Sequence, residues 1–122
     1  MNVCAGLFCD TSNQRKVLKV YDRFVRGFKP YHRVLAEKKR LIIGKHMAGT
    51  IDVLAYALKR IAGDDRHGRD ITLYGLERAL VEIMVFFPVY RTYVIGEKYD
   101  TEDMRYFAEA IDAARREHPE LE

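Results

Sequence analysis

Apolar residues recur at three- and four-residue intervals along most of this chain, a pattern typical of amphipathic α-helices. The first such stripe consists of Val17, Leu18, Tyr21, Phe24 and Val25. Gly27 supplies a stop after it, and Pro30 favours the start of the next helix. Across the chain, this periodicity predicts a mainly α fold of about five helices.

Residues 31–62 carry two apolar stripes that do not share a helix face. The first comprises Val34, Leu35, Leu41 and Ile42, and the second comprises Ile51, Leu54, Ala55, Leu58, Ile61 and Ala62. At roughly 100° per residue, their centres lie about 200° apart on one helical wheel. The segment therefore either bends near Gly44–Gly49 or passes between two different partners. We favour a nearly continuous helical segment, and whether it forms one helix or two stays open.

Two further helices are predicted in the second half of the chain. Residues 63–68 have the composition of a turn, and Thr72 or Asp70 is placed to cap the helix that follows. Its stripe is Leu73, Leu76, Leu80, Ile83, Met84 and Phe87. Pro88 ends that helix, and Thr101 is the predicted N-cap of the last one. The stripe of this last helix is Met104, Phe107, Ala108, Ile111 and Ala114.

One short segment departs from the helical pattern. Residues 89–95 are β-branched and aromatic and are bounded by Gly96, which predicts a strand or an extended segment. A single such piece does not build a sheet, and extended segments normally pair with a neighbour. We therefore expect its pairing partner to lie outside this chain.

The length of 122 residues suits one compact domain over residues 1–122, but its charge is unevenly spread. Residues 1–45 carry eleven Lys/Arg and three Asp/Glu, a net charge of +8, whereas residues 46–122 carry ten and fifteen, a net charge of −5. A basic half suits a nucleic-acid surface, an acidic neighbour or the other half of the same fold. The chain shows no helix-turn-helix pattern or glycine-rich basic loop, which disfavours nucleic acid.

No catalytic or metal-binding motif is evident in the sequence. The histidines His32, His46, His67 and His118 lack the spacing H-x-x-x-H, so we expect neither a metal nor a cofactor. Cys4 and Cys9 are five residues apart and suit reduced structural thiols. The uncharged apolar stretch 83–90 is far shorter than the ~20 residues of a membrane span, and the amino terminus does not resemble a secretory signal. We therefore expect a cytoplasmic protein without a membrane partner.

Residues 86–93 are the most informative stretch for function. Four aromatic residues, an arginine and a hydroxyl crowd the junction between a helix end and the extended segment. Aromatic rings match the C–H faces of sugars, and arginine offers several donors to hydroxyl or carboxylate groups. Alternation puts Tyr90 and Thr92 on one side, and Arg91 and Tyr93 on the other. One side therefore suits a core and the other a cleft, although aromatic clusters in general more often form core.

A series of short motifs covers nearly the whole chain. In order, they are Gly6-Leu7-Phe8-x-Asp10, Leu18-x-x-Tyr21-x-x-Phe24, Lys39-Arg40-Leu41-Ile42, Leu54-Ala55-x-x-Leu58-x-x-Ile61-Ala62, Arg69-Asp70-Ile71-Thr72, Leu76-x-x-Ala79-Leu80-x-Glu82 and Phe87-Pro88-Val89-Tyr90-Arg91-Thr92-Tyr93. Together they resemble the helical insert of maltooligosyltrehalose synthase, an α-amylase-superfamily enzyme. Two features depart from that family: Cys9-Asp10-Thr11 stands where it has valine-aspartate-proline, and Gly44 and Gly49 fall within a helix.

The resemblance implies that these residues are a helical insert domain, an excerpt of a larger (β/α)8-barrel enzyme. The family is an isomerase of trehalose biosynthesis. It converts the reducing-end α-1,4 linkage of a maltooligosaccharide into an α,α-1,1 linkage by intramolecular transglucosylation. Its aspartate nucleophile, glutamate acid/base and further aspartate lie on the barrel. None of those motifs occurs here, so we expect no catalytic residue in this chain and no activity from it alone.

The resemblance also implies which residues reach the reducing-end glucose and which partners the chain has. The expected substrate-binding residues are Phe87, Tyr90, Arg91 and Tyr93, with Arg69 and Asp70 as weaker candidates. Turn anchoring explains those last two equally well. The expected partners are the maltooligosaccharide and the remaining barrel, and bare apolar faces predict self-association of the fragment. The alternative is a helical protein-interaction or nucleic-acid-binding module.

Overall fold

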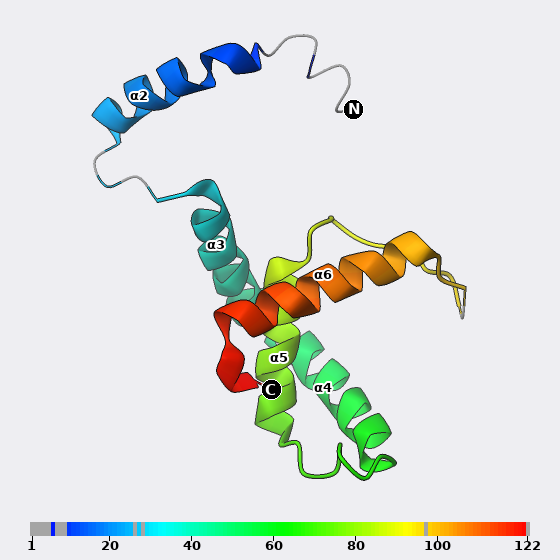
Figure 1. Cartoon of the computed structure of the whole chain (residues 1–122). Helices are drawn as coiled ribbons and strands as arrows, with labels where there is room; N and C mark the ends of the chain where they lie inside the picture. Colours follow the sequence, from blue (N-terminus) through cyan, green and yellow to red (C-terminus); the bar gives the residue numbers. More distant parts are fainter. Residues whose placement is uncertain (1–5, 7–9, 26, 28, 97, 122) are drawn as a thin grey trace. The chain divides into compact units, whose positions relative to one another are not determined.

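The computed structural model describes residues 6, 10–25, 27, 29–96 and 98–121. Its α-helices are α2 (Gln14–Phe24), α3 (Tyr31–His46), α4 (Ala48–Gly63), α5 (Leu73–Phe86) and α6 (Thr101–Glu117), with the short 3₁₀ helices η1 (Thr11–Asn13) and η2 (Pro119–Leu121) (Figure 1). No strand occurs within those described ranges. The prediction of a mainly α fold with about five helices is confirmed. The prediction for Cys4 and Cys9 lies outside the described residues.

The chain divides into two compact units, unit 1 of residues 1–34 and unit 2 of residues 35–122. In unit 1, the Asp10 carboxylate accepts hydrogen bonds from the Ser12 backbone N–H at 2.9 Å and from Asn13 Nδ2 at 2.6 Å. The bonds from Ser12 lower the pKa of Asp10 and start the helical run that continues into α2. Gly27, with a φ of +82°, stands where the sequence predicts the helix stop.

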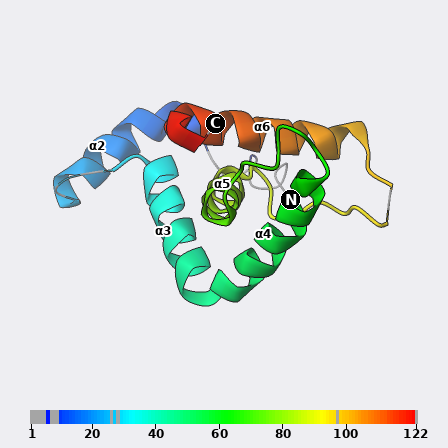
Figure 2. The ribbon, with the colours of Figure 1, turned by 90° about the horizontal axis from the view of Figure 1, so that it is seen from below.

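Of the two options left open for residues 31–62, the structure has the bend near Gly44–Gly49, and the segment forms two helices. Met47 alone separates α3 from α4, and the two helices are bent by 87°. The bend brings Ile43 of α3 and Ile51 of α4, which are both buried, into one cluster with Val85 of α5. Ile43 is not part of the predicted α3 stripe, and Leu41 and Ile42 of that stripe are 50% and 54% exposed, so that stripe does not form the core. Figure 2 shows α5 nearly end-on between α3 and α4. A straight helix, the other option, is therefore wrong.

The connection between α4 and α5 is a tightly bonded turn, as predicted. Lys59 Nζ donates to the carbonyl oxygens of Arg69 and Ile71 at 2.8 and 2.5 Å. A Cβ at Gly68 would lie 2.5 Å from the Ala62 carbonyl oxygen, so the close approach requires glycine. Thr72 then caps α5, because its hydroxyl accepts the Gly75 N–H at 3.0 Å.

The start of α6 differs by one residue from the prediction. Asp100, not Thr101, is the N-cap, and Thr101 is the first helical residue. The Asp100 carboxylate accepts the Asp103 N–H at 2.8 Å, and the Asp103 carboxylate accepts the Asp100 N–H at 3.4 Å. This reciprocal capping box satisfies two free backbone donors at once, which Thr101 as N-cap with Met104 at its N3 position does not achieve. Ala110 and Ala114 are buried, and their small size allows α6 to approach its neighbour closely.

The strand option for residues 89–95 is wrong within the described part of the chain. Residues 88–90 bend as the chain leaves α5, and residues 91–94 have no regular structure. Ile95 forms one isolated antiparallel bridge with Lys98, around Gly96 at a φ of +62°. The β-branched residues therefore do not form a β-ladder. The pairing that is described for this segment is the single bridge from Ile95 to Lys98.

Candidate functional site

The carboxyl end of α5 is held by α3. Lys39 Nζ donates to the carbonyl oxygens of Val85 and Phe87, both at 3.0 Å. The last carbonyls of a helix lack partners within it and carry a partial negative charge, which an ammonium group satisfies. The Phe87 ring also packs edge-on against Phe107 of α6, with centroids 5.2 Å apart and planes at 67°. The aromatic segment, defined as residues 89–95, therefore follows a helix end that α3 and α6 hold in place.

A buried ion pair lies one turn earlier on α5. Arg40 Nε and Nη2 donate to the two carboxylate oxygens of Glu82 at 2.9 and 2.6 Å. The Glu82 side chain is only 11% exposed, and its hydrogen bond with Arg40 raises the pKa of the arginine. The guanidinium also lies 5.6 Å from the centroid of the Phe86 ring. These contacts join α3 to α5.

The ion pair continues through His118 at the end of α6. Nε2 of His118 lies 3.4 Å from both Glu82 Oε2 and Arg40 Nη2, and Nδ1 lies 3.1 Å from Glu120 Oε1. Because the Glu120 carboxylate can only accept, we assign the Nδ1 proton to this contact. Arg78 Nη2 donates to the same Glu120 oxygen at 3.0 Å. These side chains form the charged cluster, defined as Arg40, Arg78, Glu82, His118 and Glu120, whose members are joined to one another and hold α3, α5 and the carboxyl end together.

Sequence reasoning missed the charged cluster. Arg40 and Glu82 belong to two separate sequence motifs and lie 42 residues apart. No local periodicity connects positions so distant in the chain. Their charges were a signal, since ionised side chains on faces that pack together need partners, but the sequence did not tell which faces meet.

Beyond the fixed start of the segment lies a hollow of about 440 Å³, here called the aromatic hollow. It is lined by Val89, Tyr90, Arg91, Thr92, Tyr93, Asp100, Glu102, Asp103 and Tyr106. Tyr90 is 97% exposed, and the Arg91 guanidinium lies 4.6 Å from the centroid of the Tyr93 ring. The structure thus brings together three of the predicted substrate-binding residues, Tyr90, Arg91 and Tyr93.

The opposite wall of the aromatic hollow is acidic. Glu102 Oε1 accepts hydrogen bonds from the Tyr106 hydroxyl at 2.8 Å and from Arg105 Nη2 at 3.2 Å. The bond to Glu102 raises the pKa of Tyr106. Sequence reasoning missed Glu102 and Tyr106 as site residues, although their spacing of four predicts neighbours on one helix face. The hollow therefore combines exposed aromatic rings with carboxylate acceptors.

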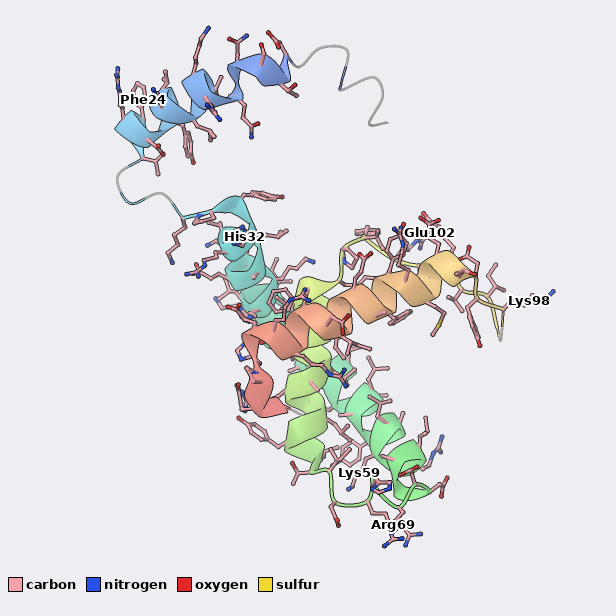
Figure 3. The ribbon with its side chains drawn as sticks, in the orientation of Figure 1. Phe24, His32, Lys59, Arg69, Lys98 and Glu102 are labelled. Carbon is pink, nitrogen blue, oxygen red and sulfur yellow. The ribbon has the colours of Figure 1, made fainter. Side chains whose placement is uncertain are left out.

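Phe87, Arg69 and Asp70 lie outside the aromatic hollow. Phe87 lines an adjacent hollow of about 490 Å³, which Tyr90 also borders. Arg69 and Asp70 belong to the α4–α5 connection, and Figure 3 shows Arg69 beside Lys59, far from Glu102. Arg69 Nε donates to the Gly63 carbonyl at 3.0 Å, so the turn employs it. The structure does not bring these two residues to the others.

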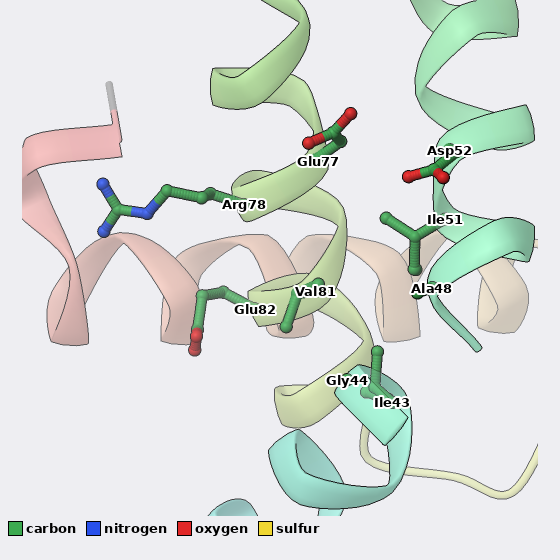
Figure 4. Close-up of a pocket in the computed structure, with 9 residues that line it drawn as sticks. All are labelled: Ile43, Gly44, Ala48, Ile51, Asp52, Glu77, Arg78, Val81 and Glu82. Carbon is green, nitrogen blue, oxygen red and sulfur yellow. The ribbon is translucent and has the colours of Figure 1, made fainter. Parts of the chain in front are cut away.

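A third cavity, of about 260 Å³, lies between the α3–α4 bend and α5. Figure 4 shows Asp52 and Glu77 directed toward each other from α4 and α5, while Arg78 and Glu82 point away from them. Within the described residues, no three or more His, Cys, Asp or Glu side chains are grouped so that they could hold a metal ion.

Within the described ranges, no helix is by itself long and apolar enough to cross a membrane, and the bent pair α3 and α4 passes that test only when taken together. The chain matches no protein-family model, no curated protein and no solved structure.

Proposed function

We propose that the chain is the helical substrate-cleft domain of an enzyme like maltooligosyltrehalose synthase. In this proposal it belongs to a larger (β/α)8-barrel enzyme, an isomerase of trehalose biosynthesis in the cytoplasm. The observation that carries the proposal is the aromatic hollow, where Tyr90, Arg91 and Tyr93 face the carboxylate of Glu102 across one concave surface.

The chemistry of the hollow suits a sugar. Exposed tyrosine rings offer flat apolar faces, while the guanidinium of Arg91 donates to hydroxyl oxygens and the carboxylate of Glu102 accepts from hydroxyl groups. A volume of about 440 Å³ lies within the range of small-ligand sites, roughly 300–1,000 Å³. Lys39 and the Phe87–Phe107 contact hold the end of α5, from which residues 89–93 of the hollow continue. This anchoring favours a preorganised binding surface over a flexible one.

The role of the chain in the reaction is to bind and to shield. The nucleophile and the acid/base come from the barrel, so the chain alone is inactive. Phe87, Tyr90, Arg91 and Tyr93 would border the reducing-end glucose and keep water from it, which favours isomerisation over hydrolysis. Arg69 and Asp70 remain the weaker candidates, since the bond from Arg69 to Gly63 supports a role in the turn.

Substitution of Tyr90 in the intact enzyme tests this proposal. We expect Tyr90→Ala to raise KM for maltooligosaccharide or to raise the share of released glucose relative to the α,α-1,1-linked product. Tyr56→Ala is the matched control, because Tyr56 is 64% exposed on α4 and lines none of the three hollows described above. Unchanged kinetics and an unchanged product ratio for Tyr90→Ala would remove Tyr90 from the cleft.

The second candidate is a helical interaction module or a nucleic-acid-binding module. The exposed apolar face of the basic helix α2 favours it, with Phe24 83% exposed. This candidate predicts salt-sensitive retention on heparin together with no response of the full-length protein to maltooligosaccharide. The carbohydrate proposal predicts a response to maltooligosaccharide and no salt-sensitive retention on heparin.

A further inference from the structure

The helix α2 has one apolar face that is exposed among the described residues of unit 1. Val17, Val20 and Phe24 on this face are 64%, 54% and 83% exposed. The cations of α2 lie beside or opposite that face, and the helix carries Arg15, Lys16, Lys19 and Arg23 against Asp22, a net charge of +3. A basic helix with an apolar face of this kind is typical of surfaces that bind an acidic, partly apolar partner.

The helix α6 has the complementary character. Its face toward α5 buries Ala110 and Ala114, while Met104 and Ala108 are exposed on another side. A shallow, mainly apolar hollow borders Met104 and Ala108. Residues 100–112 carry a net charge of −4, from Asp100, Glu102, Asp103, Glu109, Asp112 and Arg105.

We propose that α2 of one copy of this chain docks on the exposed face of α6 of a second copy. A nucleic acid or an anionic bilayer would satisfy the cations of α2 but would leave the acidic face of α6 bare. A second copy covers both apolar faces and pairs both charges, because each copy carries one face of each kind. The inference concerns this chain by itself and does not depend on the carbohydrate proposal.

The reciprocal arrangement would produce a closed dimer. If each copy places its α2 on the α6 of the other, the same helix pair is used twice about a two-fold axis. Two helix contacts then share the burial of about 1,200 Å² or more that a specific interface needs. A contact between one α2 and one α6 alone would bury less surface than a stable dimer needs.

Charge reversal gives the sharpest test. One variant, Lys16→Glu/Arg23→Glu, changes the net charge of α2 from +3 to −1, and the other, Glu109→Lys/Asp112→Lys, changes that of α6 (residues 101–117) from −2 to +2. Each variant alone then opposes like charges in both contacts, so we expect its dimer dissociation constant to rise by about tenfold or more over that of the unchanged chain. An equimolar mixture of the two restores opposite charges in both contacts, so we expect a heterodimer.

Sedimentation equilibrium between about 1 and 200 µM measures these states, and circular dichroism verifies that each variant keeps its helix content. Phe24→Asp and Met104→Asp test the apolar part and should each weaken the dimer, whereas Tyr56→Asp on α4 should not. A monomer of the unchanged chain across that range would overturn the proposal. So would a mixture of the two charge variants that stays monomeric, or binding of the monomeric chain to anionic vesicles or to nucleic acid.

Discussion

The charged cluster and the aromatic hollow lie at different places on the same scaffold and are built in opposite ways. Glu82 of the charged cluster is 11% exposed and binds Arg40 through both carboxylate oxygens. Tyr90 of the aromatic hollow is 97% exposed. Substitution of one member of a buried ion pair lowers the stability of the fold, whereas an exposed aromatic ring is free to contact a ligand. The difference separates residues that hold the fold from residues that face outward.

Removal of the Glu82 carboxylate should have the largest effect on stability. Glu82→Ala leaves the Arg40 guanidinium without its counter-ion in a half-buried position. Because Arg40 keeps some access to water, we expect a loss of about 2–3 kcal/mol in the free energy of unfolding, measured in urea. Glu77→Ala on the same helix should cost less than about 1 kcal/mol. Equal losses for the two variants would show that the charged cluster does not hold the fold.

Loss of the Lys39 ammonium should affect the position of the aromatic segment more than overall stability. Lys39→Met removes the donor to the Val85 and Phe87 carbonyls and keeps most of the apolar stem. We expect a loss of about 1–2 kcal/mol and faster amide hydrogen exchange in residues 89–94. The exposed neighbour Lys38→Met is the control and should leave exchange there unchanged. If both variants exchange alike, Lys39 does not fix the segment.

The sequence was sufficient for features that depend on neighbours along the chain. Apolar periodicity predicted the helices, and Thr72 was predictable as a cap because a hydroxyl three residues before Gly75 reaches its N–H. The two stripes that do not share a face left a bend as one of two options, and only the structure decides between them. Each of these signals lies within one or two helical turns.

Features that depend on which faces meet were not predictable in this way. The Arg40–Glu82 pair joins positions 42 residues apart, and periodicity gives no pairing between two stripes. Asp100 rather than Thr101 caps α6 because Asp100 and Asp103 hydrogen-bond each other reciprocally. In the site, Tyr90, Arg91 and Tyr93 are residues that the family resemblance implies. The acidic residues of α6 that line the same hollow are not predictable from the sequence, because their position depends on how α6 packs.

Acidification should weaken the exposed end of the charged cluster. The pKa of Glu120 lies below its ordinary value of 4.5, because the carboxylate accepts hydrogen bonds from the Glu120 backbone N–H, from His118 and from Arg78. The folded-state pKa is lowered, so the stabilisation is present above about pH 4.5 and is lost as the pH falls through the folded-state value. We expect Glu120→Gln to lose less stability than the unchanged chain between pH 7 and pH 3, measured in urea. An identical loss would mean that the Glu120 contacts contribute nothing.

The smallest expected effect concerns the Tyr106 hydroxyl in the aromatic hollow. Its bond to Glu102 raises its pKa above 10.0, so the contribution to stability is complete below pH 10 and is lost as the pH rises through the folded-state value. The absorbance of tyrosinate near 295 nm, taken as the difference between the unchanged chain and Tyr106→Phe, should titrate above 10.0. Glu102→Gln should bring that midpoint back toward 10.0, because the charge that opposes ionisation is gone. A midpoint that Glu102→Gln does not move would mean that the acidic wall is not held in place. The aromatic hollow would then be open on both sides, and its contrast with the charged cluster would be still sharper.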